Sequence, residues 1–224
     1  MGIVINKEDR VLVVSPHPDD ESIGCGGFLS LYRGQCDVLL ATDGYNEELN
    51  NKEQSEMRVK EFHNATDFLN VNNKFLLHIP ERKIKNHYNA FLKIDFSKYK
   101  YILVPNRFEE HFDHKQLYYV INKIVKQRKI DADILEYEVW TTIRHPNVKV
   151  DISTVIDDKK HAIQMHESQI KDLDYVGMIT GLNAYRGKGH DCDFAEVFYS
   201  EKQAKLKRKK ELKKRIKSRL NKSK

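Results

Sequence analysis

Two short polar clusters hold the residues whose types and spacing could do chemistry. They are PHPDDE at 16–21 and NRFEEHFDH at 106–114. Each combines imidazole with carboxylate, through His17, Asp19 and Asp20 in the first and His111, Asp113 and His114 in the second. Two imidazoles and one carboxylate suit zinc or ferrous iron in a catalytic site, where at least one position stays open for water. The clusters therefore predict a catalytic metal centre.

The remaining side chains of the clusters suit the other steps of a hydrolysis. A metal lowers the pKa of water, but a neighbouring base must still take the proton, and Asp19 is placed for that role. His111 could protonate a departing amine or stabilise the charged oxygen of a tetrahedral intermediate. Asp113 could fix the tautomer of a histidine by a hydrogen bond.

Each cluster also has a purely structural interpretation. An Asp-Asp pair at a helix start is a common N-cap with favourable charge for the helix dipole, and a histidine near a strand end is often a satisfied polar group. However, both clusters come directly after a predicted strand, which the structural interpretation does not require. We therefore interpret them as parts of one site.

Short β-branched runs alternate with helical patterns along the chain and must position these clusters. Strands are predicted at 11–15, 37–42, 74–79, 101–105 and 134–140. Helices are predicted at 52–70 and 113–128, with apolar faces made by Met57, Phe62, Ala65 and Leu69 and by Leu117, Val120, Ile121 and Ile124. The alternation predicts an α/β fold, a mostly parallel sheet with helices on both faces and a site outside the carboxyl ends of the strands.

Length and composition indicate one globular domain and a separate tail. The chain has 224 residues, of which 40% are hydrophobic and 32% charged, and we expect a single domain over 1–200. Three cysteines without CxxC spacing indicate a reducing compartment and no thiolate metal site. The first ten residues lack the apolar core of a signal peptide, and no apolar run reaches ~18 residues. We expect a cytoplasmic protein.

The tail, residues 201–224, carries most of the positive charge. It holds 13 Lys or Arg and two Glu, a local charge of +11, so the net charge of +6 leaves −5 for the rest of the chain. Leu212, Ile216 and Leu220 recur at helical spacing, and the tail is expected to be either helical or disordered. Its charge could bind the inner face of an anionic membrane, which would suit a lipid-linked substrate. The acidic body makes nucleic acid a less favoured partner.

With these motifs in place, the chain resembles the PIG-L/LmbE family of N-acetylglucosaminyl deacetylases, metal enzymes with a Rossmann-like fold. PHPDDE resembles the family's (A/P)HPDD(E) signature, and HFDH resembles its HxDH block. The resemblance extends from about residue 10 to 199 and includes TDG at 42–44, HESQ at 166–169 and LNAYRG at 182–187. Phe112 departs from the family, in which many members have proline at this position.

The resemblance implies a role for each residue of the two clusters. The implied zinc ligands are His17, Asp20 and His114, with Asp19 as general base and His111 as acid or oxyanion stabiliser. Arg58 is a candidate substrate contact, although it could instead pair with Glu61 or Asp43 on the surface. Tyr185 and Arg186 could line the pocket, and His166 is expected to be a satisfied core histidine or to support a ligand.

The sequence therefore predicts a metal-dependent hydrolase that removes the acetyl group from an N-acetylated amino sugar conjugate, lipid- or nucleotide-linked. Zinc is the expected cofactor, and ferrous iron is the alternative. Two other functions remain open, because a metal triad alone does not choose the scissile bond. One is hydrolysis of another amide or an ester. The other is a non-catalytic module that binds membrane or nucleic acid through the tail.

Overall fold

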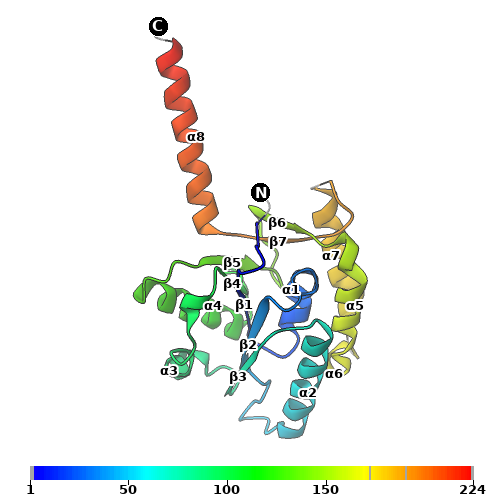
Figure 1. Ribbon diagram of the computed structural model, residues 1–224. Helices are drawn as coiled ribbons and strands as arrows, with labels where there is room; N and C mark the ends of the chain where they lie inside the picture. The colour runs from blue at the N-terminus through cyan, green and yellow to red at the C-terminus, as the bar shows by residue number, and fades with distance from the viewer. Residues whose placement is uncertain (1–2, 172, 190, 223–224) are drawn as a thin grey trace.

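A five-stranded parallel sheet forms the centre of the molecule (Figure 1). The computed structural model describes residues 3–171, 173–189 and 191–222, with the side chains of the last helix described to residue 215. The strands of the sheet are β1 (Val11–Ser15), β2 (Cys36–Thr42), β3 (Lys74–Ile79), β4 (Tyr101–Pro105) and β5 (Asp133–Tyr137). Their order is β3–β2–β1–β4–β5, and every neighbouring pair is parallel. The predicted α/β fold with a mostly parallel sheet is confirmed.

Helices connect the strands and cover both faces of the sheet. The α-helices are α1 (Asp20–Leu31), α2 (Lys52–Phe68), α3 (Tyr88–Phe91), α4 (Phe112–Gln127), α5 (Ile156–Gln164), α6 (Glu167–Ile170), α7 (Tyr175–Lys188) and α8 (Glu201–Lys222). Short 3-10 helices lie at η1 (Ile84–His87), η2 (Phe96–Lys98) and η3 (Ser153–Val155). A small antiparallel pair, β6 (Val148–Asp151) and β7 (Ala195–Phe198), completes the body.

The two sheet faces bury separate apolar clusters, because side chains alternate along each strand. Val11 and Val13 of β1 pack with side chains of α1, α2 and α5 on one face. Leu12 and Val14 pack with α3 and α4 on the other. Both faces of β1 are therefore covered, as expected for a central parallel strand whose sequence is apolar throughout.

Two sequence predictions need correction. The fifth strand ends at Tyr137 rather than at residue 140, because the Glu138 carboxylate accepts the Ile143 amide at 2.6 Å and turns the chain. Met57 is 44% exposed, so its predicted place on the buried face of α2 is wrong. Apart from Ser55, α2 buries side chains only from Glu61 onward.

Residues 201–222 of the basic tail form one helix, α8, which projects from the body in Figure 1. Its attachment includes ion pairs from Glu201 to Arg107 and from Lys202 to Asp131. Leu212 is 59% exposed, whereas Ile216 and Leu220 lie outside the residues whose side chains are described. Within the described part of the chain, no helix is both long and apolar enough to cross a membrane.

Candidate metal centre

The two polar clusters meet where the order of the sheet reverses. From β1 the chain continues to β2 and β3 on one side of β1. It then crosses to the other side, where β4 and β5 lie. The loops after β1 and β4 therefore diverge over opposite faces, and a crevice between them is the usual ligand site of such sheets. The first cluster follows β1 and leads into α1, and the second follows β4 and leads into α4.

Local hydrogen bonds shape the first cluster. The His17 carbonyl accepts the amide of Asp19 at 2.9 Å, which makes a tight turn directly before α1. The Asp20 carboxylate then accepts the His17 amide at 3.0 Å. Gly24 lets α1 approach the sheet, since an added Cβ would lie 2.4 Å from Tyr137. The start of α1 is thereby held against the carboxyl end of the sheet.

Three side-chain atoms from the clusters form a nearly equilateral triangle. The Asp20 Oδ2 atom lies 3.1 Å from His17 Nδ1 and 3.2 Å from His114 Nε2. The two nitrogens lie 3.3 Å apart. Bond lengths of about 2.0–2.1 Å and tetrahedral angles would separate two zinc ligands by about 3.3–3.4 Å. The spacing of these atoms therefore fits three ligands of a tetrahedral ion.

A buried carboxylate lies near the second ring nitrogen of His17 and of His114, the nitrogen that is not part of the triangle. Asp113 Oδ2 lies 3.2 Å from His17 Nε2, and the Asp113 carboxylate also accepts the Arg82 amide at 2.9 and 3.1 Å. Glu109 Oε2 lies 3.7 Å from His114 Nδ1, and neither atom has another partner among the described residues. Carboxylates in such positions select the histidine tautomer whose other nitrogen faces the metal.

Glu109 was not among the residues that we predicted from sequence. It is fully buried, and its Oε1 accepts the amides of Val139, Trp140 and Thr141 at 3.0–3.2 Å. The signal in the sequence was the Glu-Glu pair at 109–110, but the pattern did not tell which member faces inward. Glu110 is exposed.

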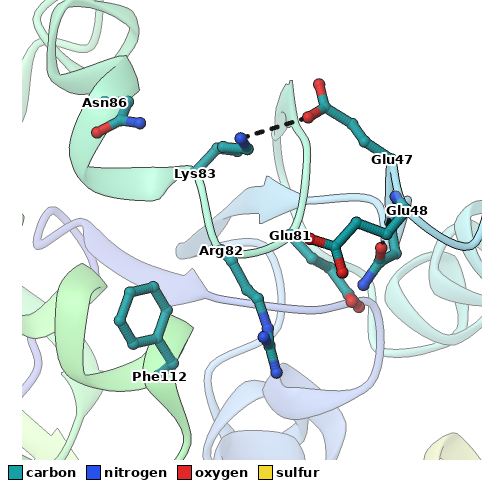
Figure 2. Close-up of a pocket in the computed structure, with 8 residues that line it drawn as sticks. Glu47, Glu48, Glu81, Arg82, Lys83, Asn86 and Phe112 are labelled. Atoms are coloured by element: carbon teal, nitrogen blue, oxygen red, sulfur yellow. Dashed lines mark hydrogen bonds and ion pairs between the residues drawn. The ribbon is translucent and has the colours of Figure 1, made fainter.

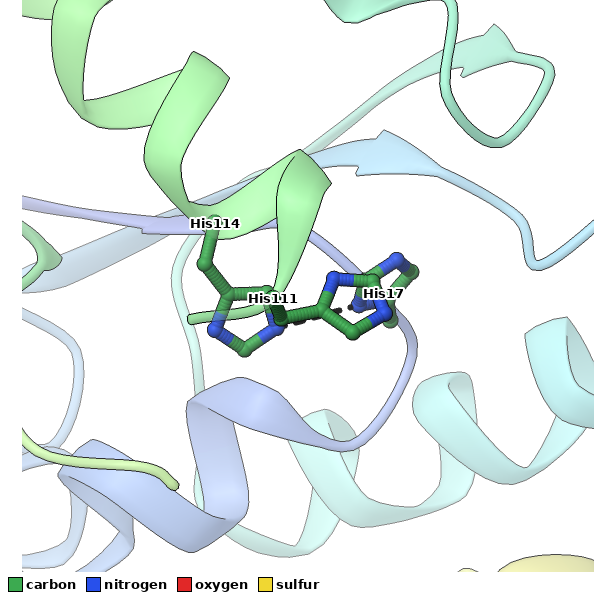
Figure 3. Close-up of side chains that lie close together, drawn as sticks. All are labelled: His17, His111 and His114. Atoms are coloured by element: carbon green, nitrogen blue, oxygen red, sulfur yellow. Dashed lines mark hydrogen bonds between the residues drawn. The ribbon is translucent and has the colours of Figure 1, made fainter. Parts of the chain in front are cut away.

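His111 lies beside the triangle at the N-terminus of α4. Its ring centroid lies 4.7 Å from that of His17 and 4.8 Å from that of His114. Figure 3 shows the three rings close together. Ligand atoms of these three histidines all lie within 4.8 Å of one another, so they form a second set that could hold a metal ion. In the set with Asp20, all three distances between ligand atoms lie between 3.1 and 3.3 Å.

Arg58 of α2 faces the same centre. Its Nη2 lies 3.3 Å from Asp19 Oδ2 and its Nη1 lies 3.9 Å from Glu81 Oε1. Gly44 makes room for it: its φ is +75°, and an added Cβ would lie 2.8 Å from Arg58 Nη1. The alternative surface pairing of Arg58 with Glu61 or Asp43 is wrong, because the guanidinium is largely buried and pairs with Asp19 and Glu81 instead.

Charges and burial shift the pKa values of the site in opposite directions. Burial lowers the pKa of His17, but hydrogen bonds to Asp113 and Asp20 outweigh it and raise the pKa to about 10. Burial raises the pKa of Asp19, against the opposing effect of Arg58. Burial and the charges of His17 and His114 lower the pKa of His111 to about 4. The carboxylates that hold a proton on His17 would equally attract a metal cation.

The other sequence-predicted residues lie in different surroundings. Arg186 pairs with Glu138 and donates to the Ile143 carbonyl at 2.9 Å, and Tyr185 is 72% exposed. Their role as substrate contacts stays a prediction. His166 is buried as expected, and its Nε2 lies 3.0 Å from Ser22 Oγ and 3.3 Å from Glu21 Oε1.

A cavity of about 390 Å³ opens beside the centre. Figure 2 shows its lining of carboxylate, amide, basic and aromatic side chains, which are Asn46, Glu47, Glu48, Glu81, Arg82, Lys83, Asn86 and Phe112. The cavity adjoins the metal centre through the backbone of Arg82, which binds Asp113, and through Phe112, which follows His111.

Residues 12–125 match the PIG-L family, described as GlcNAc-PI de-N-acetylase. The match spans half of the chain and contains both polar clusters, so the chain belongs to the PIG-L family of de-N-acetylases. The predicted family is confirmed, and with it the predicted class of enzyme, an N-deacetylase of amino sugars. No curated protein matches the sequence significantly.

Solved structures share the fold at low sequence identity. The conserved protein TT1542 from Thermus thermophilus is 24% identical, with a TM-score of 0.71 over 85% of this chain and 94% of that one. N,N'-diacetylchitobiose deacetylase from Pyrococcus horikoshii is 21% identical, with a TM-score of 0.73 over 86% and 83%. The 4-carboxy-2-hydroxymuconate hydratase from Pseudomonas putida KT2440 is 16% identical, with a TM-score of 0.68 over 86% and 96%. These likenesses support the fold alone.

Proposed function

We propose that this protein is a zinc-dependent hydrolase that removes the acetyl group from an N-acetylated amino sugar conjugate, with His17, Asp20 and His114 as the zinc ligands. The observation that carries the assignment is the triangle of their ligand atoms, with sides of 3.1, 3.2 and 3.3 Å. Two nitrogens and one oxygen suit zinc, and ferrous iron binds the same donor types.

A zinc ion supplies Lewis acidity, which makes water more acidic and an acetyl carbonyl more electrophilic. Asp19 takes the proton of the attacking water. Its carboxylate lies 3.3 Å from Arg58 Nη2, which orients it, and burial raises the pKa of Asp19 against the opposing charge of Arg58. A carboxylate whose pKa is raised accepts a proton more readily than an ordinary one, so Asp19 suits the role of general base.

His111 stabilises the oxygen of the tetrahedral intermediate. Its pKa is lowered to about 4, so the imidazole is neutral at neutral pH and offers one N–H as a hydrogen-bond donor. A neutral imidazole can donate a hydrogen bond to the oxyanion, but it has no extra proton to give to the amine at once. The oxyanion role therefore suits His111 better than the role of general acid. The proton that Asp19 removes from water is then available for the departing amine, either directly or through His111.

The cavity of Figure 2 suits a sugar ring. Carboxylates and amides such as Glu48, Asn46 and Asn86 can bind hydroxyl groups, and the face of Phe112 offers an apolar surface for the ring carbons. Arg58 bridges Asp19 and Glu81, so it is placed to bind a hydroxyl between the reacting amide and the cavity.

Helix α8 adds a second part to the proposal. Its side chains up to residue 215 are mostly basic and exposed, and Lys or Arg near an anionic membrane contributes about 1 kcal/mol each. We assign residues 1–200 to the deacetylase domain and residues 201–224 to a tail that contacts the inner leaflet peripherally. Deletion of 201–224 should abolish binding to anionic vesicles while activity on a dissolved substrate persists, and unchanged vesicle binding would contradict this role.

The decisive experiment measures acetate release from a panel of N-acetylhexosamine conjugates. The protein is assayed as purified, after chelation and after zinc restoration, beside Asp19→Ala and Glu110→Gln as an exposed control. Zinc-restored release that is lost in Asp19→Ala and kept in Glu110→Gln is expected. Release that persists in Asp19→Ala would contradict the base assignment.

Hydrolysis of another amide or an ester is the competing function. The fold also occurs in a hydratase, so it does not choose the bond. A zinc-binding protein that releases no acetate, but cleaves simple amide or ester substrates with the same dependence on Asp19, would favour this alternative.

A further inference from the structure

The start of α1 presents Asp19 and Asp20, but its N-cap residue, Asp19, makes no side-chain capping hydrogen bond. The Asp20 carboxylate is held by its own hydrogen bond from the His17 amide, at 3.0 Å. The Asp19 carboxylate has one hydrogen-bond donor among the residues that the structure describes, which is Arg58 Nη2 of α2. The direction of Asp19 therefore depends on how the first turn of α1 and helix α2 are held relative to each other.

The Glu21 carboxylate, which is fully buried, holds the first turn of α1. Its Oε2 lies 3.2 Å from Ser15 Oγ at the end of β1, and its Oε1 accepts the Ser22 hydroxyl at 2.8 Å. The His166 Nε2 atom lies 3.3 Å from the same Oε1 and 3.0 Å from Ser22 Oγ. Glu21 thus joins α1 to the end of β1 and, through His166, to the segment between α5 and α6.

This hydrogen-bond pattern makes His166 the donor. The Ser22 hydroxyl donates its single proton to Glu21, so its oxygen accepts from His166, and Nε2 carries the proton. The other ring nitrogen, Nδ1, is buried without a hydrogen-bond partner among the described residues. His166 therefore acts through Nε2 alone, and the amide nitrogen of a glutamine side chain can donate from a similar position.

The same segment also holds α2, the helix that carries Arg58. Ser168 donates its amide to Glu61 Oε1 at 2.8 Å and its hydroxyl to Glu61 Oε2 at 2.6 Å. Figure 1 shows α6 beside α2. Glu61 follows Arg58 by three residues, and residues at this spacing lie on the same side of a helix. The HESQ segment at 166–169 therefore binds both helices that form the Asp19–Arg58 pair.

We propose that His166 is a positioning residue, which fixes the direction of the Asp19 carboxylate through Glu21 and the first turn of α1. Ser168 fixes Arg58 of the same pair through α2. This proposal rests on the proposed function for the role of Asp19 as the base. Loss of His166 should lower kcat with little effect on zinc affinity, because the ligand Asp20 has a hydrogen bond of its own.

The first test compares kinetic constants. His166→Leu should lower kcat at least about tenfold, with KM and zinc affinity within about threefold of the unmodified chain. His166→Gln should recover most of the lost kcat, because its amide donates in place of Nε2. Ile163→Ala opens a cavity in the same core without removing a contact of Glu21, so it is the matched control for lost stability.

The kcat of Ile163→Ala should stay within about threefold of that of the unmodified chain. An unchanged kcat in His166→Leu, an equal fall of kcat in Ile163→Ala, or no recovery in His166→Gln would overturn the proposal.

Unfolding measurements test the same connection without catalysis. Urea denaturation of His166→Leu, Arg58→Met and the double variant gives three unfolding equilibrium constants. The effects of independent sites multiply to within about twofold, whereas a segment that holds both helices should make them depart from this product by at least about threefold. Ser168→Ala combined with Asp19→Asn should show the same coupling, and it replaces the first pair if His166→Leu does not fold.

The two measurements separate this proposal from the proposed function. Coupled unfolding effects without any acetate release from the unmodified chain would support the positioning of Asp19 and refute the deacetylase. Acetate release together with independent unfolding effects would overturn the positioning role and leave the deacetylase in place.

Discussion

Replacement of Asp113 by asparagine tests how the metal centre is held. The Asp113 carboxylate accepts a hydrogen bond from His17 Nε2 at 3.2 Å, and it accepts the Arg82 amide at 2.9 and 3.1 Å. Asparagine offers one acceptor oxygen in place of two, so either His17 or Arg82 must face an amide donor. The negative charge that favours the Nδ1 lone pair of His17 is lost as well.

The expected result is weaker zinc binding with little change of the fold. Removal of a carboxylate behind a ligating histidine costs about 10- to 100-fold in metal affinity, or about 1.4–2.8 kcal/mol. That range agrees with the loss of one charge-assisted hydrogen bond, about 1.5–3 kcal/mol. Zinc affinity is measured by competition with a chromogenic chelator, and kcat/KM is measured at saturating zinc.

Glu110→Gln is the matched control, because it makes the same chemical change three residues away at an exposed position. The control should bind zinc as tightly as the unmodified chain. A zinc affinity of Asp113→Asn within about twofold of the control would refute the argument that Asp113 orients His17, since the expected loss is at least tenfold.

Three further predictions follow from other contacts. Asp19→Asn should lower kcat about 10²- to 10⁴-fold with zinc affinity nearly unchanged, and a parallel loss of zinc would show that Asp19 is a ligand. Lys159→Met leaves the buried Glu196 carboxylate without its cationic partner at 2.7 Å, with only the Gly27 and Phe28 amides still bound to it. The free energy of unfolding, measured by urea denaturation, should fall by about 3–5 kcal/mol, and Lys159→Met/Glu196→Gln should recover part of that loss. Because the pKa of His17 is raised to about 10, its proton competes with zinc at neutral pH. Zinc affinity should therefore rise about tenfold per pH unit from pH 7 to 9, and a flat profile would contradict the raised pKa.

The strands and the two clusters could be predicted from sequence because their signals are local. Apolar runs such as 11–15 and 101–105 specify buried parallel strands, and a polar cluster directly after each strand must lie at the same edge of the sheet. The fifth strand was predicted too long, since the turn at Glu138 depends on contacts with Ile143 and Arg186 that no local pattern contains.

The partners of charged side chains were harder to predict. Arg58 was expected either to bind substrate or to pair with Glu61 or Asp43, and it pairs with Asp19 and Glu81 from two other loops. Met57 has the spacing of a buried residue, but this part of α2 buries little of its surface. Helical periodicity tells which side chains share a face, whereas burial depends on what packs against that face.

The sequence by itself determined the donor types of the centre, the strands that present them and the family to which the chain belongs. Only the tertiary structure decided that Asp20, His17 and His114 place three atoms 3.1–3.3 Å apart and that Glu109 rather than Glu110 supports His114. The physical reason is that residue type and periodicity describe a single helix or strand. The distances between side chains of α1, α4 and the loop at 80–83 are instead set by how those elements pack across the sheet.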